Sequence, residues 1–344
     1  MTLHKPPFAL KEIKLEVTHK CNLTCIHCSS EATRSCSREM PVDRALRLLD
    51  ECLALGVKEV AFSGGEPLLW HGIYDAVARC SAGGIAPTIY TSGNVDDSHM
   101  AMSLLKTNGA TRAIFTLFAA DEHAHDRITL VAGSFHKTLD AINAAQEAEL
   151  RVELHFVPMR KNYAQLPRLI DLAIDRKVTR VSVLRFVPQG RGAIHSSMAL
   201  THAQNLELRR MVTRASERIE LRAGSPYNFL LINESPECCA AIDRLTVDPQ
   251  LRIYPCDAFK RVEAQDIVGT DDYSCLDRWP LDQCWRNSPY LAAVRAYLTT
   301  PFPAQCSTCD LLERCLSGCL AQKVITHSAF RKAPDPMCLK LNRS

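Results

Sequence analysis

Hydrophobic and polar residues alternate regularly along the first two thirds of the chain. Short runs with the period of a strand, such as Ile13, Leu15 and Val17, alternate with longer stretches of helical periodicity. The expected strands are 13–17, 59–62, 85–90, 113–118, 151–157 and 179–187. The expected helices are 42–55, 71–81, 98–107, 134–149, 165–176 and 201–218. Four of these helices open with residues that favour a helix start, namely Asp43, Ser98, Ser134 and Thr201.

Six β/α units in succession predict an α/β fold with a parallel sheet and helices outside it. Six units are too few for a closed barrel of eight strands, so we expect a partial (β/α)6 barrel with reactive groups at the carboxyl ends of its strands. The alternation stops near Leu221, and cysteine, proline and aromatic residues become more frequent beyond it. We therefore expect a core domain over residues 1–220 and a smaller, cysteine-rich C-terminal domain over residues 221–344, held together by metal.

Composition narrows the class of protein. Of the 344 residues, 47% are hydrophobic and 23% are charged, which is ordinary for a globular protein. The formal net charge of +3 is too small to indicate nucleic acid or an anionic membrane as a partner. Residues 1–10 have no apolar core of a secretory signal, and no run is long enough to span a bilayer. We expect a cytoplasmic protein.

The sixteen cysteines are the unusual feature of the composition. The cytosol keeps thiols reduced, so they do not predict disulfides. Cys36, Cys52 and Cys80 are scattered singly and are interpreted as small core residues or spare thiols. Three others fall within eight residues near the N-terminus, and ten fall between Cys238 and Cys338. Such clusters indicate metal or redox chemistry.

The first cluster follows directly on the first expected strand. Its spacing is Cys21-x3-Cys25-x2-Cys28. Three thiolates on one short loop can bind three irons of a 4Fe–4S cluster. The fourth iron would then be open to a substrate or cofactor, as in other catalytic metal sites. The alternative is a zinc site, for which His27 or His19 would be the fourth ligand.

This cysteine spacing after a first strand resembles the signature of the radical S-adenosylmethionine (SAM) superfamily. The resemblance implies that Cys21, Cys25 and Cys28 are catalytic and hold a cluster that reduces SAM, which yields a 5′-deoxyadenosyl radical. A second match, at the end of the second strand, implies a segment that holds the SAM amino group, made of Gly64, Gly65, Glu66 and Pro67. Glycines let a backbone approach a ligand closely, and a carboxylate can bind an ammonium group.

Weaker matches to the same superfamily follow along the chain. Ser92 stands where relatives often have Asn, and Thr116 lies on the fourth strand, where relatives place a hydroxyl near the SAM carboxylate. Lys137 resembles the basic residue of a helix entry near SAM, and Arg185 lies on the sixth strand before residues 188–191. The resemblance implies that all four bind the cofactor. Each can equally be a cap or turn residue.

The C-terminal pattern Cys306-x2-Cys309-x5-Cys315-x3-Cys319, followed by Cys338, resembles the SPASM domain of radical SAM enzymes. The resemblance implies two auxiliary 4Fe–4S clusters, hence three clusters and SAM as cofactors. One would be bound by Cys306, Cys309, Cys315 and Cys338. The other would be bound by Cys256, Cys319 and one or both of Cys238 and Cys239.

Three points about this region stay open. Cys275 or Cys284 is a candidate for a missing ligand of the second auxiliary cluster, unless that cluster has an open iron. A zinc ribbon is the alternative for the cysteines from Cys306 to Cys319. Leu251 stands where the family usually has a glycine, which weakens the turn before Cys256 but not the ligand assignment.

SPASM relatives mostly act on a residue inside a peptide. The resemblance therefore implies hydrogen abstraction from a ribosomally made precursor peptide, followed by crosslinking through a thioether or carbon–carbon bond, or by epimerisation. The expected partners are that peptide, an external electron donor such as flavodoxin or ferredoxin and, as one option, a separate peptide-recognition protein. An anaerobic sulfatase-type protein maturase and a small-molecule radical SAM enzyme are the alternatives. A ferredoxin-like electron carrier is disfavoured because it needs neither SAM nor an open iron.

Overall fold

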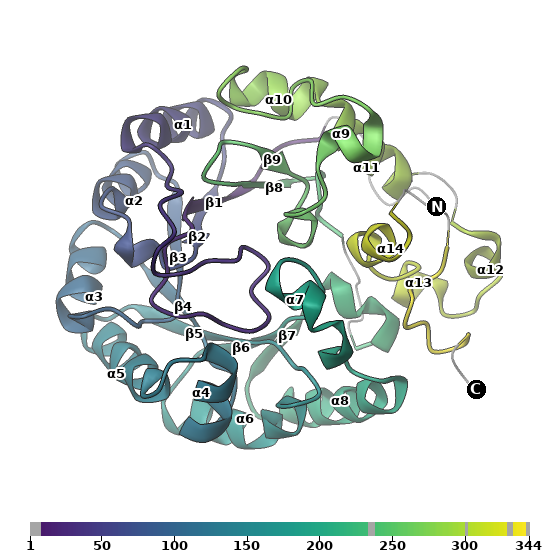
Figure 1. Ribbon diagram of the computed structural model, residues 1–344, viewed down its shortest axis with the longest axis horizontal. Coiled ribbons are helices and arrows are strands. Elements are labelled where there is room, and N and C mark those ends of the chain that lie inside the picture. Colours follow the sequence, from purple (N-terminus) through teal and green to yellow (C-terminus); the bar gives the residue numbers. More distant parts are fainter. Residues whose placement is uncertain (1–7, 233–237, 300–301, 329–332, 342–344) are drawn as a thin grey trace.

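A computed structural model describes residues 8–232, 238–299, 302–328 and 333–341. The strands form one nine-stranded sheet in the order β7-β6-β5-β4-β3-β2-β1-β8-β9 (Figure 1). Their bounds are β1 (Glu12–Thr18), β2 (Glu59–Gly64), β3 (Ala86–Thr91), β4 (Arg112–Thr116), β5 (Arg151–Phe156), β6 (Arg180–Val183), β7 (Glu220–Ala223), β8 (Arg244–Val247) and β9 (Ile253–Tyr254). All neighbouring pairs are parallel except β8 with β9. The predicted parallel sheet is confirmed, and it is a partial barrel because β7 and β9 do not pair with each other.

Helices run round the outside of the curved sheet (Figure 1). The longer ones are α1 (Val42–Ala54), α2 (Ile73–Ala82), α3 (Ser98–Thr107), α4 (Glu122–Thr129), α5 (Ser134–Glu147), α6 (Leu166–Asp175), α8 (His202–Ala215), α11 (Pro289–Thr299) and α14 (Leu320–His327). The shorter ones are α7 (Arg191–Ile194), α9 (Ala264–Val268), α10 (Leu281–Asn287), α12 (Ala304–Ser307) and α13 (Leu312–Cys315). No helix within the described residues is long and apolar enough to cross a membrane. All six predicted helices are present, whereas α4, α7 and α9 to α14 were not predicted.

Helix starts follow the sequence only in part. Thr201 caps α8 as predicted, because its hydroxyl accepts from the Gln204 amide at 3.2 Å while the Gln204 side chain accepts from the Thr201 amide at 2.9 Å. The cap of α3 is Asp97, which accepts from Met100, and not Ser98. Pro41 precedes α1 without a side-chain cap, so Asp43 lies in the first turn. Ser134 is likewise the first helical residue of α5 and not its cap.

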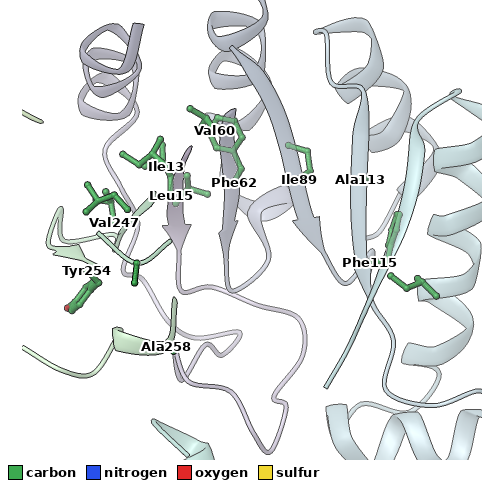
Figure 2. Packing of buried hydrophobic residues seen from close by; sticks show 14 of the residues in the cluster. Ile13, Leu15, Val60, Phe62, Ile89, Ala113, Phe115, Val247, Tyr254 and Ala258 are labelled. Carbon is green, nitrogen blue, oxygen red and sulfur yellow. The ribbon is translucent and has the colours of Figure 1, made fainter. Parts of the chain in front are cut away.

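The two faces of the sheet have different chemistry. Side chains on the outer face, such as Ile13, Leu15, Val60 and Phe62, are fully buried in one continuous hydrophobic core under the helices (Figure 2). The intervening residues point into the barrel, because successive side chains of a strand alternate between faces. This inner face is polar. The hydrophobic residues of each alternating run therefore face the core, and the polar residues between them face the lumen.

Charged residues fill the lumen near the amino ends of the strands. Glu153 of β5 is fully buried and pairs with Arg180 of β6 at 2.6 Å and with Arg112 of β4 at 3.6 Å. Arg112 also pairs with Glu59 of β2, and Arg244 of β8 pairs with Glu12 of β1 at 2.5 Å. These pairs cross the sheet from strand to strand. They occupy the end of the barrel opposite the loop that carries the first three cysteines.

The C-terminal region contributes to the same sheet. β8 pairs with β1 in parallel, with Ile13 opposite Leu245 and Leu15 opposite Val247, and β9 continues the sheet beyond it. The pattern of the sequence did not reveal β7, β8 and β9 because they have only two to four residues each. The sheet therefore extends on both sides of residue 220, the expected domain boundary, so that boundary does not separate two sheets.

Candidate cluster and cofactor site

The loop after β1 carries Cys21, Cys25 and Cys28 across the carboxyl ends of the strands, beside α7 (Figure 1). It is fastened to the end of α4, because the Thr24 amide donates to Thr129 O and the Ile26 amide to Ile128 O, both at 3.0 Å. Cys21 is only 8% exposed. The backbone around these cysteines is thus set by a neighbouring β/α unit.

The three thiols lie close enough to influence one another electrostatically. Burial raises the pKa of Cys21 to about 12, with further contributions from Glu66 and Cys28. Burial also raises the pKa of Cys25 well above its usual value, and Cys28 and Cys21 add to this. Arg191 opposes both shifts. Thiolates in such a place need positive charge beside them, which the irons of a cluster provide.

The two histidines named for the zinc alternative face a carboxylate and an aromatic ring. His19 Nε2 is 3.4 Å from Glu16 Oε2, and the His27 ring packs edge-on against Phe118 with its centre 4.7 Å away. Burial lowers the pKa of His27 to about 4. Among the described residues, no three His, Cys, Asp or Glu side chains are placed as ligands of a single metal ion.

Gly64 and Gly65 lie directly against the cysteine loop. The Gly65 amide donates to Thr18 O at 2.6 Å, and the Glu66 amide donates to Lys20 O at 2.8 Å. A Cβ atom on Gly64 would lie 2.1 Å from Thr18 O, and one on Gly65 would lie 2.2 Å from Lys20 O. Gly64 also has φ +133°, which favours glycine. The close approach that these glycines allow is therefore made to the backbone of the loop.

The Glu66 carboxylate is fully buried beside the end of β3. It accepts hydrogen bonds from the Thr91 hydroxyl at 2.6 Å and from the Ser92 amide and hydroxyl at 2.9 and 2.7 Å. The Leu68 amide adds a longer one, at 3.3 Å, within the turn that Pro67 begins. Burial raises the pKa of Glu66, and these hydrogen bonds oppose the rise. The structure thus brings Glu66, Pro67 and Ser92 together, as the sequence matches suggested.

Asn22 and Asn94 were not predicted as site residues. Asn22 Nδ2 donates to Asn94 O at 2.7 Å, and Asn94 Nδ2 donates to Thr138 Oγ1 at 2.9 Å. This chain of bonds joins the cysteine loop to the end of β3 and to α5. No signal in the sequence could have paired Asn22 with a residue 72 positions away.

The remaining expected cofactor residues lie in different places. Thr116 is half-buried at the end of β4, opposite His155 of β5. Lys137 is exposed on α5. Arg185 lies two residues beyond β6, and its guanidinium binds Asp335 of the C-terminal region in a bidentate pair, at 2.8 and 3.0 Å. It also lies over the Phe229 ring, 4.6 Å from its centre.

The four cysteines expected to bind one auxiliary cluster line a single pocket of about 280 Å³. They are Cys306, Cys309, Cys315 and Cys338. Cys306 Sγ lies 3.3 Å from Ser317 Oγ, which also lines the pocket. Burial raises the pKa of Cys315 to about 12, with Asp335, Cys338 and Cys306 adding to it. These thiols therefore share one site, although Cys338 is 23 positions from Cys315.

A second group of thiols contains Cys238, Cys256 and Cys319. Burial raises the pKa of Cys238 to about 12, and the Cys319 thiol makes the next largest contribution. Burial raises the pKa of Cys256 too, with Cys238 and Cys319 contributing. Cys239 acts less strongly on Cys238 and also raises the pKa of Arg244. Three of the expected ligands of the second auxiliary cluster therefore lie together.

Cys275 and Cys284 are neighbours of each other. Cys284 Sγ lies 4.0 Å from Cys275 O and 3.7 Å from Trp279 O. Burial raises the pKa of Cys284 to about 12, and its charged neighbours after Cys275 are Glu51 and Arg44 of α1. Cys275 and Cys284, the latter on α10, therefore lie close to α1.

Lys260 is a further residue of the site that sequence reasoning missed. Its Nζ donates to Glu16 Oε1 at 2.6 Å, and the Ser30 hydroxyl donates to the same oxygen at 2.7 Å. Cys28 is among the groups that raise the pKa of Lys260. Glu16 continues the charged positions Glu12 and Lys14 of β1, so nothing in the sequence singled it out as the partner of Lys260. Lys260 of the C-terminal region and Ser30 of the cysteine loop therefore share the Glu16 carboxylate.

Comparison with known proteins agrees with this arrangement. Residues 15–173 match the sequence model of the Radical SAM superfamily. A PqqA peptide cyclase from Granulibacter bethesdensis is 28% identical over 346 residues, which cover 98% of this chain and 88% of that protein. A PqqA peptide cyclase from Bradyrhizobium diazoefficiens is 28% identical over 337 residues, covering 95% and 85%.

Solved structures share the fold. SuiB of Streptococcus suis bound to S-adenosylmethionine has a TM-score of 0.77 at 18% identity, over 96% of this chain and 77% of that one. The complex of SuiB with its precursor peptide SuiA has a TM-score of 0.74 at 20% identity, over 96% and 76%. The protein anSMEcpe with bound AdoMet and a peptide has 0.74 at 12% identity, over 96% and 94%.

Proposed function

We propose that the chain is a radical SAM enzyme that joins two residues of a ribosomally made precursor peptide by a radical reaction at the cysteine loop. The observation that carries this proposal is the similarity to PqqA peptide cyclases over 98% of the chain, with the cysteine-rich C-terminal region included. Because these relatives are named peptide cyclases, the similarity favours crosslinking over epimerisation.

The residues present fit an iron–sulfur cluster and SAM. Cys21, Cys25 and Cys28 are three thiols on one loop with mutual electrostatic influence. When bound, a 4Fe–4S cluster and SAM together supply a 5′-deoxyadenosyl radical that removes a hydrogen atom from a substrate carbon. Glu66 and Ser92 are the proposed contacts of the SAM amino group, with Thr116, Lys137 and Arg185 as further candidates to be tested.

The chain itself orients the substrate and excludes water. The lumen below the cysteine loop is lined by half-buried Lys14, Tyr90 and His155, and the Lys14 ammonium lies 4.1 Å from the centre of the Tyr90 ring. The Tyr90 and His155 rings are 5.1 Å apart. These side chains offer a polar, aromatic wall to a residue that enters the barrel.

We further propose that the C-terminal region, residues 221–344, holds two auxiliary 4Fe–4S clusters. The pocket lined by Cys306, Cys309, Cys315 and Cys338 supports one of them. The grouping of Cys238, Cys256 and Cys319 supports the other, with Cys239 as the fourth ligand or with one iron open. Closing a crosslink removes two hydrogens from the peptide, so the second electron must leave through such a centre to an external acceptor. Flavodoxin or ferredoxin is the proposed donor of the first electron.

The experiment uses the reconstituted enzyme with SAM, a reductant and any short peptide that a reading frame next to its gene encodes. We expect the peptide to lose the mass of two hydrogens and to gain a bond between two of its residues, visible by tandem mass spectrometry. Cys25→Ala is the matched control and should leave the peptide unchanged. A peptide of unchanged mass with an inverted residue would replace crosslinking by epimerisation. Release of 5′-deoxyadenosine that responds to a free metabolite and to no peptide would contradict the peptide proposal.

A further inference from the structure

Three cations from later parts of the chain lie around the cysteine loop: Arg191 and Arg261 bond to it, and Lys260 pairs with Glu16, which Ser30 of the loop also binds. Arg191, the first residue of α7, makes the largest number of bonds to the loop. Its amide donates to Cys28 O at 3.1 Å, its Nε to Cys25 O at 2.9 Å, and its Nη2 to Ala32 O at 2.9 Å. Arg191 thus donates to three carbonyls of the loop, between Cys25 and Ala32.

The backbone before Arg191 is shaped to reach the loop. Gly190 has φ +55°, and a Cβ atom there would lie 2.5 Å from Ser29 O and 2.8 Å from Cys28 O. Only glycine allows two backbones to approach so closely. This close backbone approach fixes the position of Arg191 and places its guanidinium beside the loop.

Unlike the charges of Lys260 and Arg261, the charge of Arg191 is not compensated by a carboxylate. Lys260 pairs with Glu16 at 2.6 Å and with Asp257 at 3.6 Å, and Arg261 pairs with Glu31. Within the described part of the chain, Arg191 makes no ion pair, and its side chain donates to carbonyls. Its charge opposes the rise in the pKa of Cys21 and Cys25 and contributes to the lowered pKa of His27.

We propose that Arg191 is a positioning residue of the cysteine loop whose uncompensated charge raises the reduction potential of the cluster held there. The inference rests on the proposed function, because it requires a cluster at Cys21, Cys25 and Cys28. Reduction adds one negative charge to the cluster, and a nearby cation in a poorly solvated place stabilises the reduced form. Net charge and hydrogen bonding around a cluster are among the features that set its potential.

Two substitutions separate charge from geometry. Arg191→Gln removes the charge and keeps a donor, whereas Arg191→Lys keeps the charge and loses the forked donor geometry. The control is Arg218→Gln, an exposed arginine paired with Asp171 on the outer helices. The measurement is a redox titration of the reconstituted enzyme followed by electron paramagnetic resonance, reading only the signal that changes when SAM is added. Iron content is measured in parallel.

At a fixed potential we expect Arg191→Gln to lower the ratio of reduced to oxidised cluster about tenfold, a shift of about 59 mV for one electron. Arg191→Lys should shift by less than half as much, and Arg218→Gln should not shift. Equal shifts in the Gln and Lys variants, or none in either, would overturn the electrostatic role. If Arg191→Gln holds no iron at the loop, Arg191→Lys decides alone, since a large shift in it overturns the proposal. A wild-type enzyme without an SAM-responsive signal would instead overturn the proposed function.

Discussion

The Glu66 carboxylate is fully buried and accepts four hydrogen bonds. Its two oxygens offer about four lone-pair positions, and Thr91, Ser92 and Leu68 already direct donors at them. An ammonium group of SAM can therefore reach this carboxylate only where a donor turns away. The Thr91 and Ser92 hydroxyls can rotate, whereas the two backbone amides are held by the turns. This makes Ser92 part of the proposed contact.

We predict that Glu66→Gln weakens SAM binding. Removing the charge while keeping the shape should cost roughly 1.5–3 kcal/mol, which is about tenfold to over a hundredfold in affinity. Calorimetric titration with SAM measures this, with iron content as a check that the clusters remain. Glu59→Gln, at the other end of β2, is the control and should bind SAM normally. Unchanged affinity in a folded Glu66→Gln variant would remove Glu66 from the cofactor site.

Leu251 occupies a backbone conformation that favours glycine. It has φ +65° and is 5% exposed, in a turn where its amide donates to Asp248 O at 2.9 Å. Its carbonyl accepts from the Leu276 amide at 2.8 Å. The turn expected to be weakened by the missing glycine is therefore formed with a left-handed leucine, and burial of the side chain offsets the backbone strain.

Two substitutions measure that strain. We expect Leu251→Gly to be more stable to unfolding than Leu251→Ala by about 1 kcal/mol, because only the alanine keeps a Cβ in the left-handed region. At Leu245, in the ordinary extended backbone of β8, the order should reverse by roughly 0.5–1 kcal/mol. Denaturant unfolding of all four variants gives both differences. Equal stability of the two variants at position 251 would show that the left-handed conformation costs nothing there.

At the scale of elements, one ion pair connects the end of β6 to the C-terminal region. Asp335 binds Arg185 through both oxygens and also accepts from the amides of Cys319 and Met337, at 3.0 and 2.9 Å. The pair is nearly inaccessible to solvent. Asp335 therefore lies between the thiol group that contains Cys319 and the pocket that contains Cys338, and it fastens both to the barrel.

We predict that Arg185→Ala lowers the free energy of unfolding by about 3–5 kcal/mol, since it leaves the buried Asp335 carboxylate without its partner. The exposed pair Arg218–Asp171 is the control, and Arg218→Ala should cost less than about 1 kcal/mol. Unfolding in denaturant measures both. SAM affinity tests the cofactor role in the same variant, because a SAM contact at Arg185 requires that it fall while a purely structural role leaves it unchanged.

At the scale of the whole molecule, the cysteine loop is where distant parts of the chain meet. It accepts hydrogen bonds from the turn after β2, from Arg191 and from Arg261, whose Nε donates to Ser29 O at 3.0 Å, and it donates hydrogen bonds to α4. The two other thiol groups lie in the C-terminal region, one with Cys306 of α12 and Cys315 of α13, and the other with Cys319 just before α14. The three proposed clusters thus occupy separate sites that iron analysis can distinguish.

We predict about twelve irons per chain after anaerobic reconstitution, because three 4Fe–4S clusters hold four each. Changing Cys21, Cys25 and Cys28 together to Ala should remove about four and abolish SAM cleavage. Changing Cys36, Cys52 and Cys80 to Ala is the control and should leave the iron content unchanged. Full iron with continued SAM cleavage in the first variant would contradict the central assignment. Zinc without iron–sulfur absorption in the wild type would favour the ribbon interpretation for the C-terminal cysteines.

The sequence by itself determined those features that are encoded within a few residues of one another. Periodicity predicted six strands and six helices, all of which are present, because each element selects its own core face locally. The Cys21, Cys25 and Cys28 loop and the Gly64-Gly65-Glu66 segment are also local patterns, and both lie at the carboxyl ends of the strands because each directly follows a strand.

Only the tertiary structure decided which distant segments meet. Lys260 reaches Glu16 over 244 positions, and Arg185 reaches Asp335 over 150. Arg185 was expected at SAM on sequence grounds, yet its side chain is bound in the C-terminal region. Strands of two to four residues, such as β8 and β9, have too little periodicity to recognise. Their place beside β1 follows from the register and curvature of the whole sheet, and this placement brings Lys260 and Arg261 to the cysteine loop.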